Sequence, residues 1–171
     1  MHQVLDVARM KIITINKTNF SEVQSIYQDG IATGVATFET VVPDWDYWNN
    51  NHLPIGRILA IKDDQFLGWA SLSAVSKRKV YSGVAEVSVY VSKHFRGQKV
   101  GDFLLKKLIK ISEQHNIWTL QAGIMRANKA SLRLHTNNGF RIVGYKEQIG
   151  QLNGIWLDNV ILERRSKTVG C

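Results

Sequence analysis

A carboxylate and a basic, glycine-bearing turn lie close together in residues 84–101. The β-branched segment 84–91, which carries Glu86, leads into the turn Arg96-Gly97-Gln98-Lys99-Val100-Gly101. We expect an amphipathic helix to begin at the end of this turn. Backbone N–H groups at a helix N-terminus have no intrahelical partner, and the helix dipole favours anions there. The stretch therefore predicts a proton acceptor on a strand beside a site for a phosphate-bearing molecule.

The turn does not match the common phosphate-binding fingerprints. It contains neither the G-x-G-x-x-G pattern of dinucleotide-binding proteins nor the G-x-x-x-x-G-K-[ST] pattern of nucleoside triphosphatases. On its own, the turn also fits an ordinary strand-to-helix connection in which Arg96 and Lys99 are solvated.

Hydrophobic periodicity and turn residues predict the elements that would position these groups. Ser21 is expected to cap the first helix, Gly139 to end the last one, and Asn153-Gly154 to form a hairpin turn. The order of elements indicates one α/β layer domain with a mixed sheet. We predict strands over 10–15, 57–62, 66–75, 84–92, 117–124, 141–149 and 155–163, and helices over 21–33, 44–50, 101–115 and 128–138.

Composition excludes several classes of protein. The 171 residues are 44% hydrophobic and 21% charged, as in a soluble globular domain. Cys171 is the one cysteine, which excludes an intrachain disulfide and a cysteine metal cluster, and the five histidines lack paired spacing, so we expect no metal. No apolar run is long enough to span a bilayer, and the first nine residues lack the apolar centre of a signal peptide. We expect a cytoplasmic protein that does not bind a membrane.

The net charge of +8 has three readings: a solvated surface, attraction of a polyanionic small molecule, or attraction of nucleic acid. The chain has no run of five basic residues, no paired zinc ligands and no aromatic RNA-binding motif. We therefore expect no nucleic-acid partner and favour a polyanionic small molecule over one.

The basic turn resembles motif A of the GNAT superfamily of acyl-CoA N-acyltransferases, whose usual pattern is Arg/Gln-x-x-Gly-x-Gly/Ala. Lys99 stands where the first glycine normally stands; a residue entering a helix need not be glycine, and the lysine could add a phosphate contact. Other segments resemble the phosphinothricin N-acetyltransferase branch of that superfamily, and the resemblance runs from about residue 27 to 166. These segments are 31–34, 36–40, 68–73, 83–91, 117–124, 134–135 with 139–140, and 162–166.

This resemblance implies a GNAT fold, which is a central mixed, mostly antiparallel β-sheet with splayed central strands beside a β-bulge, flanked by α-helices. It places a single acetyltransferase domain at 10–166, with terminal extensions at 1–9 and 167–171. It also implies that acetyl-CoA lies in the cleft between the splayed strands, with backbone amides near Val89 and Val91 binding its pantetheine arm. The implied cofactor-binding residues are Val89, Tyr90, Val91, Arg96, Gly97, Gln98, Lys99, Val100, Gly101, Asn128 and Ser131.

Two residues are candidates for proton transfer. Glu86 could take a proton from an α-ammonium group if partial burial raised its pKa; otherwise it is a surface residue or pairs with Arg78. His135 follows Asn128 by seven residues, where the resemblance implies a proton donor to the departing thiolate. A lone helical histidine is more often structural, and Asn128 also suits a helix N-cap.

The resemblance implies a small amino acid as substrate: phosphinothricin, methionine sulfone or methionine sulfoximine. Its binding residues would be Phe38, Glu39, Arg78, Tyr81 and Glu86, since an arginine fork pairs well with a carboxylate or a tetrahedral oxyanion. Arg78 also fits a mobile basic loop, because Lys77 and Lys79 flank it. Family resemblance further implies a homodimer.

The predicted function is transfer of an acetyl group from acetyl-CoA to the α-amino group of such an amino acid in a ternary complex. Two alternatives stay open: acetylation of another amine, such as a polyamine or a protein N-terminus, and a non-catalytic acyl-CoA sensor. A nucleic-acid-binding role ranks last.

Overall fold

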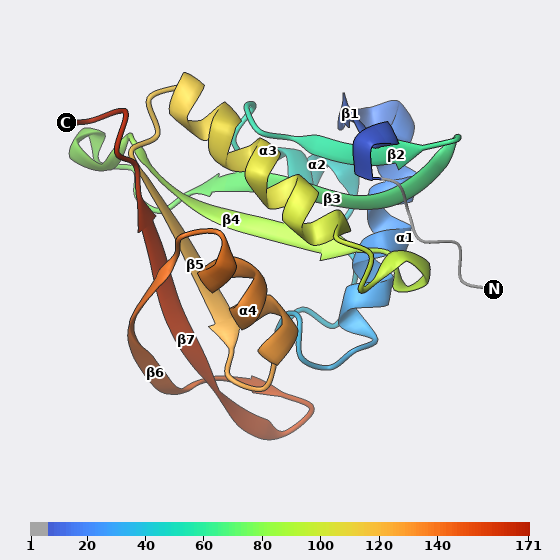
Figure 1. Ribbon diagram of the computed structural model, residues 1–171. Helices are drawn as coiled ribbons and strands as arrows, with labels where there is room; N and C mark the ends of the chain where they lie inside the picture. The colour runs from blue at the N-terminus through green and yellow to red at the C-terminus, as the bar shows by residue number, and fades with distance from the viewer. Residues whose placement is uncertain (1–6) are drawn as a thin grey trace.

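Within residues 7–171, seven strands form one sheet in the order β1-β2-β3-β4-β5-β7-β6, in which only β4 and β5 pair in parallel (Figure 1). The computed structural model describes residues 7–171. The predicted mixed, mostly antiparallel sheet is confirmed. Its strands are β1 Lys11–Thr14, β2 Ile58–Lys62, β3 Gln65–Ala74, β4 Val84–Val91, β5 Thr119–Met125, β6 Arg141–Leu152 and β7 Ile155–Arg165, and the helices are α1 Phe20–Ile31, α2 Trp45–Asn51, α3 Val100–Gln114 and α4 Lys129–Asn137.

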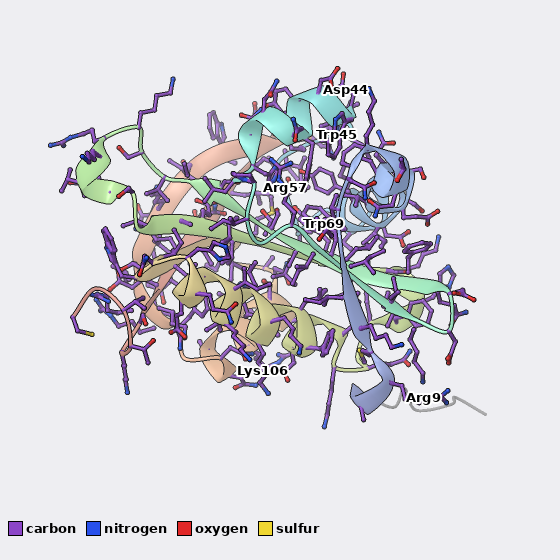
Figure 2. All side chains as sticks on the ribbon, turned by 90° about the horizontal axis from the view of Figure 1, so that it is seen from above. Arg9, Asp44, Trp45, Arg57, Trp69 and Lys106 are labelled. Atoms are coloured by element: carbon purple, nitrogen blue, oxygen red, sulfur yellow. The ribbon has the colours of Figure 1, made fainter. Side chains whose placement is uncertain are left out.

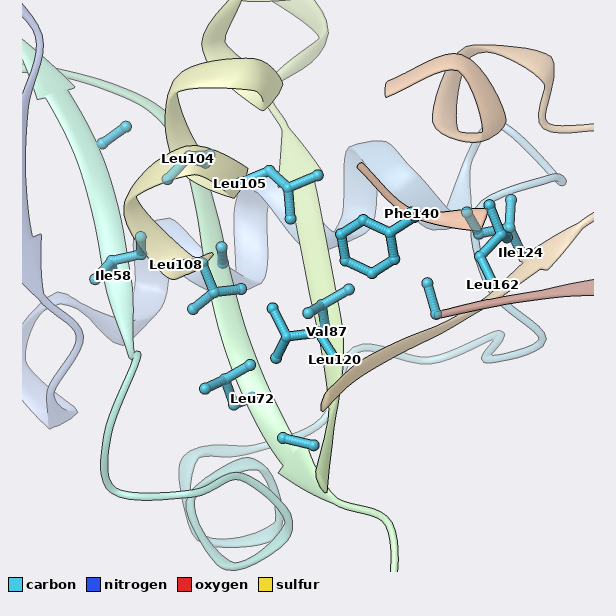
Figure 3. Packing of buried hydrophobic residues seen from close by; sticks show 14 of the residues in the cluster. Ile58, Leu72, Val87, Leu104, Leu105, Leu108, Leu120, Ile124, Phe140 and Leu162 are labelled. Carbon is cyan, nitrogen blue, oxygen red and sulfur yellow. The ribbon is translucent and has the colours of Figure 1, made fainter. Parts of the chain in front are cut away.

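The helices cover the sheet on both faces. Figure 2 shows α2, with Asp44 and Trp45, on one side of the sheet and α3, with Lys106, on the other. Leu104, Leu105 and Leu108 of α3 pack on the strands in an aliphatic core that also includes Phe140 (Figure 3). The opposite face, under α1 and α2, packs a second cluster that is mostly aromatic and includes Phe20, Trp48 and Trp69.

The two central strands separate after a short parallel contact. Strands β4 and β5 pair only from Val84 to Glu86 on β4, whereas β4 continues to Val91, and the two strands diverge in the ribbon (Figure 1). The expected β-bulge beside this opening is wrong for the β3–β4 ladder, whose register is continuous. A register shift does occur in the neighbouring β2–β3 ladder, between Ala60 and Ile61 of β2. The splay therefore follows from the early end of the β4–β5 pairing.

The ends of several elements differ from the sequence prediction. The N-cap of α1 is Asn19 and not Ser21, because a short 3₁₀ turn at Lys17–Asn19, capped by Asn16, leads directly into the helix. Strand β6 is longer than predicted. Asn153 and Gly154 both have positive φ, which confirms the tight hairpin turn.

Both ends of the described chain contact the domain. Met10 is buried, whereas residues 1–6 of the expected N-terminal extension lie outside the described residues. At the other end, the guanidinium of Arg165 donates hydrogen bonds to the carbonyls of Trp118, Val169 and Gly170. Within residues 7–171, no helix has the length and apolar character needed to cross a membrane.

Candidate active site

A cleft of about 1050 Å³ opens where β4 and β5 part. Three predicted site residues, Arg78, Tyr81 and Gln98, are not among those that line it. The cleft does bring together the remaining predicted residues: Phe38, Glu39, Glu86, Val89, Tyr90, Val91, Arg96, Gly97, Lys99, Val100, Gly101, Asn128, Ser131 and His135.

The N-terminus of α3 forms one end of this cleft. Lys99 is the N-cap residue, and its side chain makes no capping hydrogen bond, so the first backbone N–H groups of the helix have no side-chain acceptor. Gly97 has a φ of +74° and open space where a Cβ would be. A helix start of this kind, facing a cleft that Arg96 and Lys99 also line, fits the phosphates of a coenzyme.

Lys99 adopts the left-handed conformation, with φ 64° and ψ 10°. A lysine pays a steric penalty there that a glycine does not. The backbone therefore keeps the conformation that the usual glycine would favour, although a lysine occupies the position. Two other side chains of the turn form hydrogen bonds with the backbone. Arg96 donates to the carbonyl of Asp29 on α1, and Gln98 donates to the carbonyl of His94.

Helix α4 contributes a chain of hydrogen bonds to the opposite wall. The Oδ1 atom of Asn128 accepts from the backbone N–H of Ser131 at 3.1 Å, so the N-cap role of Asn128 is confirmed. The carbonyl of Ser131 lies 2.8 Å from Nδ1 of His135, and the imidazole packs edge-on against Phe140.

This geometry defines the protonation of His135. A carbonyl can only accept, so Nδ1 carries the hydrogen, and the neutral ring keeps only a lone pair at Nε2. Burial lowers the pKa of His135, although its bond to Ser131 acts in the opposite sense. At neutral pH the ring therefore has no second proton to give, which argues against His135 as donor to a thiolate.

Glu86 lies on the same face of β4 as Ser88 and Tyr90, opposite the face that carries Val89 and Val91. Although its side chain touches solvent, the walls of the cleft remove part of its hydration, and this raises the pKa of Glu86; the charge of Lys146 on β6 partly opposes the rise. Among the described residues Glu86 forms no ion pair with Arg78. Its position suits a general base.

The segment between α1 and α2 closes the acceptor side of the cleft. The ring of Phe38 lies so close to Gly150 of β6 that a Cβ there would approach it to 2.8 Å. Phe38 and Glu39 both line the cleft, as predicted. In contrast, the Arg78 guanidinium lies 5.3 Å from the ring centroid of the exposed Tyr81, so these two residues contact each other outside the cleft.

Sequence reasoning missed three polar residues here. Arg133 of α4 and Asn159 of β7 line the cleft, and Lys146 acts electrostatically on Glu86. The Oδ1 atom of Asn159 is buried without a hydrogen-bond partner among residues 7–171. A sequence signal for them was weak, because Lys146 and Asn159 reach the site through the pairing of a long hairpin. No group of three potential metal ligands occurs in the described chain.

Comparison with known proteins identifies the fold and family. The chain is 33% identical to a phosphinothricin N-acetyltransferase of Alcaligenes faecalis, over 83% of this chain and 75% of the relative. It is 30% identical to an L-methionine sulfoximine/L-methionine sulfone acetyltransferase of Pseudomonas aeruginosa, over 81% and 84%. A phosphinothricin acetyltransferase from Sinorhizobium meliloti, solved with acetyl-CoA, superposes with a TM-score of 0.84 at 24% identity, over 95% of this chain and 91% of that one. Residues 22–140 match the Acetyltransferase (GNAT) family, and the chain therefore belongs to this family of enzymes.

Proposed function

We propose that this enzyme transfers the acetyl group of acetyl-CoA to the α-amino group of a small amino acid of the methionine sulfone, methionine sulfoximine or phosphinothricin kind. One observation carries the proposal. A carboxylate with a raised pKa, Glu86, faces the same cleft as an uncapped, positively charged helix N-terminus. Relatives named for these substrates support the substrate class.

The residues suggest a direct transfer in a ternary complex. Glu86 accepts a proton from the bound α-ammonium, so that the amine lone pair can attack the thioester carbonyl. Backbone N–H groups of Val89 and Val91, on the part of β4 that no longer pairs with β5, would stabilise the negative charge on that oxygen. As the carbon–sulfur bond breaks, the new amide nitrogen would release its second proton to solvent and the thiolate would take one from solvent, because neutral His135 holds its only N–H on Ser131.

The coenzyme site would use main-chain groups more than side chains. The N-terminus of α3 would hold the pyrophosphate, with Lys99 and Arg133 as nearby cations, and Asn128 and Ser131 would border the pantetheine arm. At Gly101 the helix packs closely on α4, because a Cβ there would come within 3.1 Å of Leu134.

We also propose a single domain over residues 10–166 that forms a homodimer in the cytoplasm. Buried Met10 and the bond between Ser166 and Glu113 support these domain limits. Exposed apolar side chains on the β6–β7 hairpin support association, and size-exclusion chromatography with light scattering tests it. These side chains are Ile142, Val143, Tyr145, Ile149, Ile155 and Trp156.

The test of function is release of CoA from acetyl-CoA with L-methionine sulfone, L-methionine sulfoximine or L-phosphinothricin. Turnover with at least one of them is expected. If none reacts although acetyl-CoA binds, the amino-acid proposal fails; polyamines and peptide N-termini are then assayed. Tight coenzyme binding with no acceptor at all would instead indicate an acyl-CoA sensor.

A further inference from the structure

A second, smaller cavity of about 150 Å³ adjoins the cleft on the face of the sheet that carries α1 and α2. The cavity and the cleft share Tyr27, Glu39, Ser88 and Tyr90 as lining residues, so the two spaces lie next to each other. No sequence pattern predicted this cavity. Its other walls come from the loop before α2, from α2 itself and from β3: Pro43, Tyr47, Trp48, His52 and Trp69.

The cavity lies where the side chain of an acceptor would reach. Glu86 and Ser88 are on the same face of β4 and are two residues apart, or about 7 Å along the strand. An amino acid whose nitrogen lies at Glu86 can therefore extend its side chain past Ser88 into the cavity. A cavity of this size holds a ligand of about six non-hydrogen atoms.

The lining contains aromatic rings, hydroxyl groups and one carboxylate, that of Glu39, but neither lysine nor arginine. Trp69 stacks on Tyr90 with ring centroids 4.7 Å apart, and Trp48 stacks on His52 at 4.2 Å. Nδ1 of His52 donates to the carbonyl of Trp48, and burial lowers the pKa of His52, with Arg57 acting in the same sense. The imidazole is therefore neutral at neutral pH.

Behind this wall lies a cation, Arg57, whose hydrogen bonds go to other groups. Arg57 lies 5.4 Å from the ring centroid of Trp48 and donates to the carbonyls of Asn49, His52 and Leu53. Figure 2 shows Arg57 and Trp69 between the sheet and α2. An anionic group placed in the cavity would thus meet Glu39 and, among the described residues that line it, no lysine or arginine, which is unfavourable for a partly desolvated ion.

We propose that this aromatic cavity, lined by Tyr47 and Trp48 of α2 and by His52 directly after it, holds the side chain of the acceptor and selects an uncharged one over an anionic one. Its hydroxyl groups suit the neutral oxygens of methionine sulfone, whereas the phosphinate of phosphinothricin lacks a cationic partner there. The inference rests on the proposed function, because it assumes that an amino acid reacts at Glu86.

The test uses binding as well as turnover. We would measure the affinity of L-methionine sulfone and of L-phosphinothricin for the full chain saturated with CoA, by calorimetry, and kcat/KM for both with acetyl-CoA. We expect a preference for the sulfone of about tenfold or more in both measurements. Equal or better binding of phosphinothricin overturns the inference.

A charge introduced at the cavity mouth sharpens the test. Tyr47 is 62% exposed, so Tyr47→Arg leaves the core intact and adds a cation to the lining. It should reduce the preference for the sulfone about threefold or more. Gln65→Arg, which adds the same charge at the exposed first residue of β3, should leave the preference unchanged. An unchanged preference in Tyr47→Arg overturns the inference.

The two proposals fail in different ways. Selective binding of the sulfone without turnover would contradict the proposed reaction and support the cavity's selectivity. Turnover of phosphinothricin that equals turnover of the sulfone would support the reaction and overturn the selectivity. Binding of neither amino acid would overturn both.

Discussion

The two faces of the sheet differ in the side chains of their cores and in the part of the candidate site that each face contributes. The face under α3 and α4 has an aliphatic core and presents main-chain groups, at the start of α3, to the coenzyme. The face under α1 and α2 has an aromatic core and presents side chains, those of Glu86 and of the aromatic cavity, to the acceptor. A coenzyme shared by a whole family can be bound by backbone geometry, whereas a particular acceptor requires particular side chains.

The largest expected effect comes from the acceptor face. Glu86→Gln keeps the size of the side chain but removes the base, so kcat/KM should fall by about 10²–10⁴-fold. The affinity for acetyl-CoA, measured by calorimetry, should not change, because the proposed coenzyme site uses the start of α3 and not the carboxylate of Glu86. A variant that retains most of its activity would show that another group or water takes the proton.

Arg57→Met should disrupt the aromatic face without touching the coenzyme site. The guanidinium makes four hydrogen bonds of 2.5 to 2.9 Å to Leu53, Asn49 and His52 near the C-terminal end of α2. Losing them should reduce the free energy of unfolding, measured in urea, by about 2–4 kcal/mol.

Arg126→Met is the control for this change, since Arg126 is 66% exposed and makes one contact of 3.5 Å with Asp158. Its effect should stay within about 0.5 kcal/mol. Equal losses in both variants would mean that the hydrogen bonds of Arg57 do not hold α2 in place.

Lys99→Gly tests the coenzyme face. Glycine accepts the left-handed conformation, so the free energy of unfolding should rise by about 1 kcal/mol. Loss of the cation should raise the KM for acetyl-CoA about two- to fivefold. Lys99→Ala should give the same KM without the gain in stability; a gain of equal size in both variants would show that backbone strain is absent.

The smallest effect concerns the pH dependence of the acceptor face. Glu86 must be deprotonated to act, so kcat/KM should rise with pH through its raised pKa. Because Lys146 lowers that pKa, Lys146→Met should move this acid limb to higher pH and leave the plateau unchanged. Lys11→Met, on the distant strand β1, is the control. If the acid limb does not move in Lys146→Met, the charge of Lys146 does not affect the protonation of Glu86.

The sequence predicted the coenzyme face better than the acceptor face, and the reason is locality. Strand β4, the turn after it and helix α3 are consecutive in the chain. Their hydrophobic period and their glycines can therefore be recognised within one segment of the sequence. Trp48, Trp69 and Tyr90 follow one another at intervals of about 20 residues and meet only when α2 packs on the sheet. No local pattern encodes that meeting.

Backbone details also escaped prediction where tertiary contacts decide them. The left-handed Lys99 contradicts its intrinsic preference, and Arg78, expected to bind the substrate, contacts Tyr81 outside the cleft; its role toward the substrate stays a prediction. The hairpin at Asn153-Gly154 was predictable because the turn type depends on these two residues alone.

The brief contact between β4 and β5 divides the sheet mechanically into two halves. Strands β1 to β4 form one ladder and β5 to β7 another, and three residue pairs at one end join them. Beyond that junction, a coenzyme lying in the gap takes the place of missing strand-to-strand hydrogen bonds. Binding should therefore slow amide hydrogen exchange along the second half of β4 more than in any ladder that is already complete.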